Sequence, residues 1–315
     1  MDYYYEEMYP SLKALEKMRL SSISKLKNRA IMLCVFGVGL CIILLQSGLF
    51  SFIQALLMST AIGGILFLFF YRYEKAGYDT LFKDNVIEKI IYFMDPTLQY
   101  NKEKFISQEV YEYSGLFPHS FDRYQGSDFV EGKREGVDIS FSDLHVEEKR
   151  TGKNNKEEWH TLFQGLFFCA DFHKNFHGKL YVLPDVAERS LGTFGSWLQS
   201  MHRSQGELIK LDHAAFEKQF VVYGTNQIEA RYILSHAFME RIVSFYEKSG
   251  KNLSLGFVNG KMYLALEYHK ALFSSSLNAS LLTFSHIKGY VELLEMIFGI
   301  VESLALDKKL WSKYE

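Results

Sequence analysis

The chain of 315 residues contains little cysteine and little proline. Its three cysteines, Cys34, Cys41 and Cys169, do not form a disulfide framework, so nothing in the sequence requires an oxidising compartment. We interpret all three as small hydrophobic residues, because free cysteine is among the most buried residue types. The presence of only four prolines argues against long disordered linkers.

An excess of charge of one sign is also missing, since the net charge is only −2. This charge is unevenly distributed: residues 1–75 carry eight Lys or Arg against five Asp or Glu, whereas residues 76–315 carry 27 against 32. The larger, mildly acidic part lacks the basic patch that duplex nucleic acid demands, so we expect no nucleic-acid partner. The basic excess lies beside an apolar stretch, where anionic lipid headgroups would attract it.

Familiar catalytic motifs do not occur either. The chain has no P-loop, no dinucleotide fingerprint and no HExxH sequence. Ser196 and the serines at 274–276 lack the GxSxG context of a hydrolase elbow. The sequence therefore predicts no catalytic residue and no cofactor.

What the chain does contain is a long run without charge. Residues 30–71 are 42 consecutive uncharged residues between Arg29 and Arg72. One crossing of a bilayer core takes about 20 apolar residues, so this run has the length of two crossings. Polar residues at 46–51 predict a tight turn between them. Both halves should be helical, because backbone polar groups in lipid must be bonded internally.

Small residues in both halves predict that the two helices approach each other closely. These residues are Gly37, Gly39, Ser59, Ala61, Gly63 and Gly64.

The charges beside this run predict its orientation. Ten basic residues flank it, and the turn carries none. They are Lys13, Lys17, Arg19, Lys25, Lys27 and Arg29 before the run, and Arg72, Lys75, Lys83 and Lys89 after it. Because an excess of Lys and Arg stays cytoplasmic, both termini are expected inside. A cleaved signal peptide fits poorly, since its n-region would be about 29 residues long.

Three parts of the chain follow from this pattern: an N-terminal amphipathic helix at 1–29, a transmembrane helical hairpin at 30–72 and a cytoplasmic domain at 73–315. The N-terminal helix has apolar residues at helical spacing and a basic opposite face. It either continues into the first crossing, or lies on the lipid surface, or pairs with a partner helix.

Periodicity in residues 73–315 predicts an α+β domain. We expect a helix at 78–93, ended by Asp95 and Pro96, and a weakly alternating segment at 105–113. A strand follows at 136–146 with a register change near Leu144. Residues 147–158 are expected to form a charged hairpin loop.

The rest of this domain is expected to be mainly antiparallel sheet with inserted helices. Asn259 and Gly260 are a strong hairpin signal between two of its strands. The expected strands are 158–171, 180–183, 208–211, 220–223, 253–258 and 262–268, and the expected helices are 228–234, 236–248 and a closing helix at 285–304.

Four strings in this part resemble a known family. They are FQGLFFCADFHKNFHGKLYVLP, LDHAAFEKQFVVYGTNQIEARYIL, AFMERIV and LGFVNGKMYLALEY. Together with the preceding helix and hairpin, they resemble the uncharacterised bacterial domain-of-unknown-function family thirty-one thirty-seven. The resemblance implies a multi-pass protein of the bacterial cytoplasmic membrane without an established activity or cofactor. Members are often encoded near LemA-type membrane proteins, which implies a LemA-like partner.

The densest group of metal-capable side chains is Cys169, Asp171, His173 and His177. A zinc site needs three or four ligands at fixed distances. No second pair at ligand spacing occurs nearby, so we predict a strand end with surface histidines and no metal.

Two further groups are candidates for binding. Glu229 and Arg231 form either a recognition site for a carboxylate or phosphate or an internal ion pair that closes a helix onto the sheet. Phe194, Trp197 and Met201 place apolar bulk in a stretch rich in Gly and Ser at 186–205. This stretch either docks on a partner or the lipid surface, or packs over the sheet.

Two functions remain open. The first is a membrane-anchored binding or scaffolding module in a membrane protein assembly, whose ligand the sequence does not reveal. The alternative is a membrane-anchored, hydrolase-like enzyme with an unrecognised site. Two crossings without a buried charge offer no translocation path unless the protein forms a homo-oligomer.

Overall fold

The computed structural model describes residues 2–152, 155–172, 178–185, 206–268, 273, 275–282 and 285–306. Its elements are α1 (Asp2–Gln46), α2 (Phe52–Phe82), a π-helix η1 (Lys83–Ile87), α3 (Glu88–Met94), β1 (Gln99–Asn101), α4 (Gln108–Ser114), β2 (Arg123–Arg134), β3 (Val137–Thr151), β4 (Glu157–Asp171), β5 (Lys179–Pro184), β6 (Glu207–Leu208), α6 (Ala214–Glu217), β7 (Phe220–Gly224), α7 (Gln227–Ile233), α8 (His236–Ser249), β8 (Leu253–Val258), β9 (Lys261–Glu267) and α9 (Ser285–Leu306).

The chain divides into two compact units. The first consists of Met1–Ile90 with Ser274–Lys288, and the second of Ile91–Phe273 with Gly289–Glu315. The boundary that the sequence suggested, at 72/73, differs from this division. A short segment from late in the sequence belongs to the helical first unit, which local sequence patterns do not reveal.

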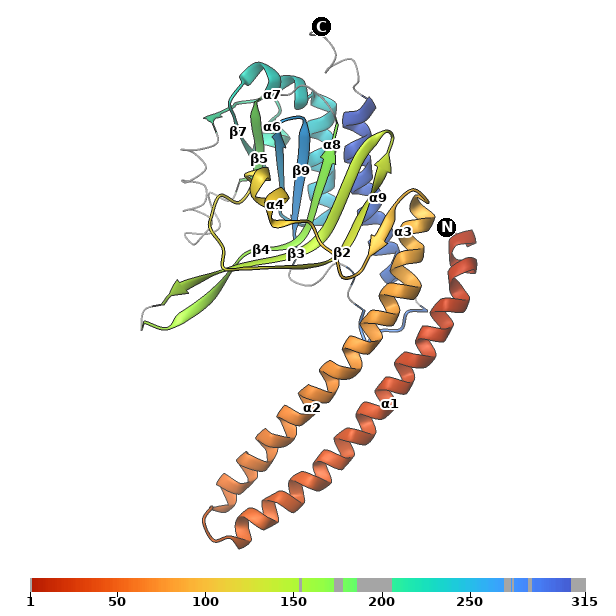
Figure 1. Ribbon diagram of the computed structural model, residues 1–315, viewed down its shortest axis with the longest axis vertical. Coiled ribbons are helices and arrows are strands. Elements are labelled where there is room, and N and C mark those ends of the chain that lie inside the picture. The colour runs from red at the N-terminus through yellow and green to blue at the C-terminus, as the bar shows by residue number, and fades with distance from the viewer. Residues whose placement is uncertain are drawn as a thin grey trace. The chain divides into compact units, whose positions relative to one another are not determined.

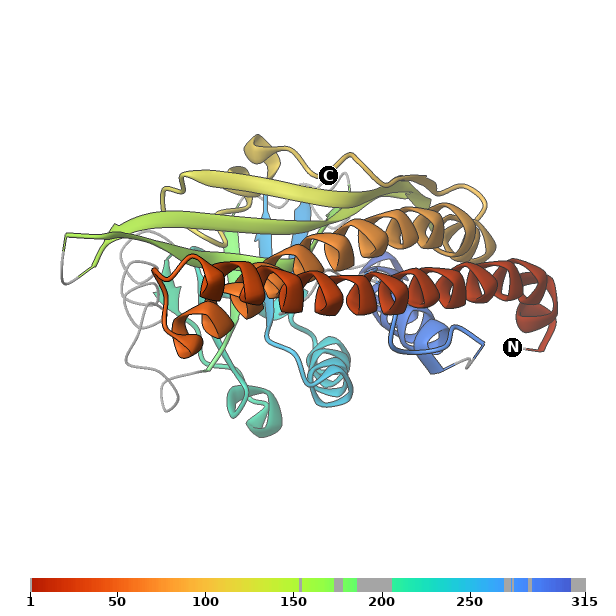
Figure 2. The same cartoon turned by 90° about the horizontal axis from the view of Figure 1, so that it is seen from below.

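The first unit is built on an antiparallel helical hairpin, in which α1 and α2 lie side by side in both views (Figure 1, Figure 2). Helix α1 is continuous from the N-terminal segment through the first apolar run. Of the arrangements expected for residues 1–29, the structure therefore has the one that continues into the first apolar helix.

The predicted tight turn between the helices is confirmed. Gly48 has a φ of +69°, in the left-handed region that glycine tolerates without strain. Ser51 caps α2, since its hydroxyl accepts the Gln54 N–H at 3.4 Å while the Gln54 side chain accepts the Ser51 N–H at 3.0 Å. These reciprocal bonds fix the start of the second apolar helix.

Helix α2 extends well beyond the apolar run. The helix expected to begin at residue 78 is its continuation, through the π-helical turn η1 and into α3. The helical stretch ends at Met94, directly before Asp95 and Pro96, as the sequence predicted. Residues 83–94 therefore prolong α2 rather than form a separate element.

In the second unit, nine strands of the described residues form one sheet in the order β1-β2-β3-β4-β9-β8-β5-β7-β6 (Figure 1). Neighbouring strands pair antiparallel throughout this order. The Asn259-Gly260 turn between β8 and β9 has φ values of +48° and +77°, which is the two-residue hairpin geometry that this dipeptide favours. The α+β class with a mainly antiparallel sheet is thus confirmed.

Both faces of this sheet are covered, as the central strand β4 shows. Phe167 points to the face where Tyr111 of α4 packs, with ring centroids 5.3 Å apart. The next residue, Phe168, points to the opposite face and stacks on Phe141, which meets Phe298 of α9. Figure 2 shows α8 and α9 on one side of the strands and α4 on the other. Burial on both faces explains why residues 165–170 of β4 are all apolar or glycine.

Helix α9 closes the second unit through polar contacts as well. Arg134 of β2 forms ion pairs with Glu302 at 2.8 Å and with Asp95 at 3.2 Å. Arg241 of α8 donates to the carbonyl oxygen of Gly299 at 2.7 Å. Burial would raise the pKa of the Asp95 carboxyl, but hydrogen bonds from Thr97 and Arg134 outweigh it and lower that pKa.

Two local predictions are wrong. The segment expected to alternate as a strand at 105–113 contains helix α4, which ends at Gly115 with a φ of +65°. It buries Tyr111 against the sheet, and tertiary packing of this aromatic ring outweighs the weak alternation.

Residues 147–158 were expected to be a charged loop, but most of them belong to β3 and β4. Arg150 lies opposite Glu158 in register, and Lys149 forms a diagonal ion pair with Glu157 at 2.9 Å. A charge run can therefore form a paired arm of a sheet when opposite charges are direct or diagonal neighbours across the strands. The predicted register change occurs between Val146 and Glu147.

Candidate functional site

The outside of the hairpin is covered by apolar side chains. Ile31 and Val35 on α1, and Ile53 and Ile65 on α2, are between 65% and 69% exposed. By length and composition alone, both helices could cross a membrane. Exposure of such a surface to water would be unfavourable, because each Å² of exposed apolar area costs about 25 cal/mol of free energy.

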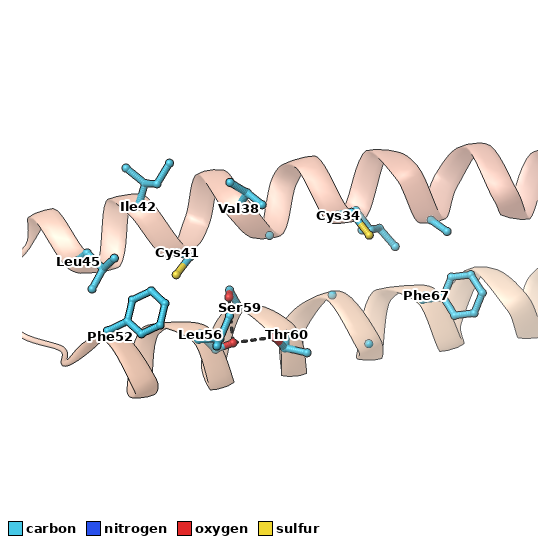
Figure 3. A pocket seen from close by; sticks show the side chains of 15 residues that line it. Cys34, Val38, Cys41, Ile42, Leu45, Phe52, Leu56, Ser59, Thr60 and Phe67 are labelled. Carbon is cyan, nitrogen blue, oxygen red and sulfur yellow. Dashed lines mark hydrogen bonds between the residues drawn. The ribbon is translucent and has the colours of Figure 1, made fainter.

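An apolar cleft of about 730 Å³ lies between α1 and α2. Figure 3 shows Cys41 of α1 pointing toward α2, with Phe52, Leu56 and Phe67 of α2 around the same space. The lining contains both Cys34 and Cys41, which are seven residues apart on α1 and therefore share one helix face. The cleft is open along the apolar part of the hairpin.

The predicted close approach of the helices is wrong at the four glycines, although Ser59 is buried. A Cβ atom added at Gly37, Gly39, Gly63 or Gly64 would meet no atom within 4 Å. Larger side chains such as Phe52 and Phe67 line the same cleft beside these glycines and occupy space between the helices. The four glycines therefore leave a groove open instead of closing a helix–helix contact.

The polar atoms at the cleft are satisfied within α2. The Thr60 hydroxyl donates to the Leu56 carbonyl at 2.7 Å, and the Ser59 hydroxyl donates to the same oxygen at 3.1 Å (Figure 3). With these donors used, the cleft presents mainly hydrocarbon. Its chemistry suits an acyl chain or an apolar helix and does not orient a polar substrate.

Several polar contacts lie where the apolar part of the hairpin ends. Glu74 of α2 is buried and forms an ion pair with Arg29 of α1 at 2.9 Å. The Ser22 hydroxyl donates to the same carboxylate at 3.0 Å, and the Arg29 guanidinium lies 4.7 Å from the centre of the Phe70 ring. These contacts tie the charged ends of the two helices together where the uncharged run begins.

A second cluster of buried charged residues lies closer to the N-terminus of α1. Glu16 and Arg19 are each only 8% exposed, and two Arg19 nitrogens donate to the two carboxylate oxygens at 3.0 and 2.7 Å. Arg19 also donates to the Leu277 carbonyl at 2.7 Å, and Glu16 accepts from the Leu281 N–H at 3.3 Å. A buried ion pair of this kind is stable only because its remaining groups are also hydrogen-bonded.

Residues 275–282, called here the strap, thus belong to the hairpin's charged end. The strap also contacts α2, where the Ser275 N–H donates to Asp79 at 3.0 Å and the Ser275 hydroxyl donates to the same oxygen. It therefore bridges α1 and α2. Sequence reasoning missed it, since the contacts join residues about 200 or more positions apart. The only local signal was the oppositely charged pair at 16 and 19.

The predicted pair Glu229 and Arg231 lies on α7, which Asn226 caps by accepting the Ile228 and Glu229 N–H groups. The two side chains form no ion pair. Arg231 is exposed and donates to the Lys210 carbonyl at 3.4 Å, whereas one Glu229 carboxylate oxygen is buried without a hydrogen-bond partner. The predicted internal ion pair is wrong, because residues two apart on a helix do not face each other.

An exposed arginine with one long hydrogen bond should contribute little to folding. Arg231→Ala is expected to change the free energy of unfolding by less than about 0.5 kcal/mol. Asn226→Ala, in the same helix, should cost about 1 kcal/mol because it removes the cap. Thermal unfolding of the full chain in detergent checks both, and a larger loss for Arg231→Ala than for Asn226→Ala would contradict this placement.

Of the other predicted contact residues, Phe194, Trp197 and Met201 lie outside the described residues, as do His173 and His177. Cys169 is buried on β4, and burial raises the pKa of its thiol to about 12. Asp171, two residues on, forms an ion pair with Lys261 at 3.1 Å. The thiol is therefore held protonated in a hydrophobic environment.

Comparison with known proteins supports the resemblance seen in the sequence. A family described as protein of unknown function (DUF3137) matches residues 161–306, from within β4 to the end of α9. The predicted resemblance to this family is thereby confirmed over these residues. No curated protein matches the chain.

Among solved structures, the chain is similar to the crystal structure of the mycobacterial trehalose monomycolate transport factor A, TtfA. The similarity has a TM-score of 0.35 at 8% sequence identity and covers 68% of this chain and 93% of that one.

Proposed function

We propose that this chain is a membrane-anchored binding module, in which the α1–α2 hairpin crosses the bacterial cytoplasmic membrane and the sheet domain lies in the cytoplasm. The observation that carries the proposal is the hairpin itself. Its 42 uncharged residues fold as two antiparallel helices with their apolar side chains exposed. A bilayer would cover that surface and match its length.

The orientation rests on the charges at the hairpin's open end. Ten Lys and Arg residues lie within 20 residues on either side of the uncharged run, and residues 47–51 between the helices include none. Positive charge resists transfer out of the cytoplasm, so both chain ends are proposed to stay inside. The Arg29–Glu74 pair, whose carboxylate is buried, fits a position at the boundary of the hydrocarbon, since an unpaired charge there would be costly.

The binding role rests on the cleft between α1 and α2. Its volume and hydrocarbon lining suit a partner within the bilayer, either a lipid chain or an apolar helix. A second copy of this chain and the LemA-like protein implied by the family resemblance are two sources of such a helix. In the cytoplasmic domain, Glu229 remains a proposed ligand contact, because a donor on the ligand would satisfy its buried carboxylate oxygen.

Reporter fusions test the proposed arrangement. An alkaline phosphatase reporter, active only outside the cytoplasm, should be inactive when fused after Tyr100 or Glu315 and active when inserted after Gly48. A reporter active only in the cytoplasm should give the opposite pattern. An active phosphatase after Tyr100 would contradict the orientation, and equal activity at all three positions would contradict the two crossings.

A further inference from the structure

Outside the hairpin, three side chains with metal-binding atoms converge in the second unit. His213 precedes α6 as its N-cap, while His236 and Glu240 lie four residues apart on the first turns of α8. One ligand atom from each of the three lies within 4.8 Å of the others. The two histidines are 23 residues apart in sequence, so the fold and not the local spacing brings them together.

The spacing of these groups is close to that of ligands around one ion. His236 Nδ1 and Glu240 Oε1 are 3.6 Å apart, which is too long for a hydrogen bond. Two ligands of a tetrahedral zinc ion, with bonds of about 2.0–2.2 Å, are about 3.3 Å apart. The His213 and His236 rings lie with their centroids 4.6 Å apart. Small rotations of exposed side chains would bring all three groups to bonding distance.

His213 supplies a second, independent observation. Its Nε2 atom is buried and has no hydrogen-bond partner. Its Nδ1 atom accepts the Phe216 N–H at 3.1 Å, and the same N–H is also 3.1 Å from the His213 carbonyl oxygen. A buried polar atom without a partner is unfavourable, and a bound ion is one way to satisfy it.

Coordination through Nε2 requires the neutral ring to carry its proton on Nδ1. The Nδ1 atom then no longer accepts from Phe216, but that N–H keeps the His213 carbonyl oxygen as its acceptor. The exchange moves one proton within the ring and leaves the Phe216 N–H paired with the carbonyl oxygen. The Nδ1–H would then face that same N–H, and two donors repel each other, so the ring must also rotate away from the backbone when it changes from helix cap to metal ligand.

We propose that His213, His236 and Glu240 bind a divalent transition metal ion of the zinc type. Two imidazoles and one carboxylate are a ligand set that such ions accept, and three protein ligands leave a fourth position for water or another donor. Since two of the three residues are largely exposed, that fourth position faces solvent. The site joins the start of α6 to the start of α8.

Titration of the full chain with Co²⁺ tests this proposal. The protein is purified in detergent with a tag that contains no histidine, and the visible absorption of the bound ion is followed. One equivalent of Co²⁺ should bind, and Zn²⁺ should displace it. His236→Ala, Glu240→Gln and His213→Asn should each weaken binding by about tenfold or more. His213→Asn retains a capping oxygen, so this change removes the ligand without removing the cap.

His160→Ala is the matched control. His160 lies on β4, where it pairs with Glu148 of β3, and it does not belong to the candidate metal site. This substitution should therefore leave the titration unchanged. Zn²⁺ should also raise the melting temperature of the unaltered chain and of His160→Ala, but not of His236→Ala. The proposal is overturned if the unaltered chain binds no Co²⁺ or Zn²⁺ at tenfold excess. Binding that survives all three ligand substitutions overturns it as well.

Discussion

Arg19→Ala should lower the free energy of unfolding by about 3–5 kcal/mol, because it leaves the buried Glu16 carboxylate without its cation. The change also removes the donor to the Leu277 carbonyl, so the strap should loosen from α1. Chemical unfolding of the full chain in detergent measures the first effect. Hydrogen exchange of the amides at 275–282 measures the second, and their protection should fall.

Lys17→Ala is the control for this prediction, since Lys17 is exposed on the same helix and should be nearly neutral. Arg19→Lys should recover only part of the stability, because lysine cannot make the two-pronged contact with both Glu16 oxygens. If Arg19→Ala were as mild as Lys17→Ala, the Glu16–Arg19 pair would have to be solvated rather than buried.

Gly165→Ala should prevent stable folding of the sheet. Gly165 has a φ of +152°, and an added Cβ atom would lie 2.0 Å from the Leu266 carbonyl oxygen on the neighbouring strand. Relief of that clash requires β4 and β9, two central strands of the sheet, to separate at the end of their pairing, where Gly165 lies opposite Glu267. We expect a loss of more than about 4 kcal/mol, which few single substitutions reach.

The matched control is Gly77→Ala in α2, where an added Cβ meets no atom within 4 Å. It should stabilise the helix by up to about 1 kcal/mol, because glycine is a poor helix former. Both variants are compared by yield of folded chain and by thermal unfolding. A Gly165→Ala protein that melts like the unaltered chain would show that the two strands do not approach as closely as described.

The sequence predicts those features of the fold that depend on local signals. The uncharged run, its polar interruption and the Asn259-Gly260 turn locate the hairpin helices and one strand pair, because each signal acts within a few residues. The apolar part of β4 at residues 165–170 can be predicted equally well, since burial on both faces leaves no polar side chain in it.

Features that depend on long-range packing were missed. Helix α4 was expected to be strand, because the burial of Tyr111 against β4 is invisible in a local pattern. Arg19 was counted only as one of the flanking positive charges, although its fold partners are Glu16 and the strap.

The candidate metal ligands were missed for the same reason. His236 and Glu240 have helical spacing, but the third ligand, His213, belongs to a separate segment. At Cys169, Asp171, His173 and His177 the sequence predicted no metal, and Cys169 is a buried thiol of raised pKa.

Labelling of single cysteines tests the central claim, the proposed membrane topology, most directly. In a chain with Cys34, Cys41 and Cys169 replaced by alanine, Leu49→Cys lies in the turn between α1 and α2, and Glu103→Cys lies in an exposed loop after β1. A maleimide that does not cross membranes, applied to intact cells, should label the Leu49→Cys protein. It should label the Glu103→Cys protein only after the membrane is permeabilised. Labelling of Glu103→Cys in intact cells, or protection of both positions, would contradict a hairpin that crosses the membrane twice with its domain inside.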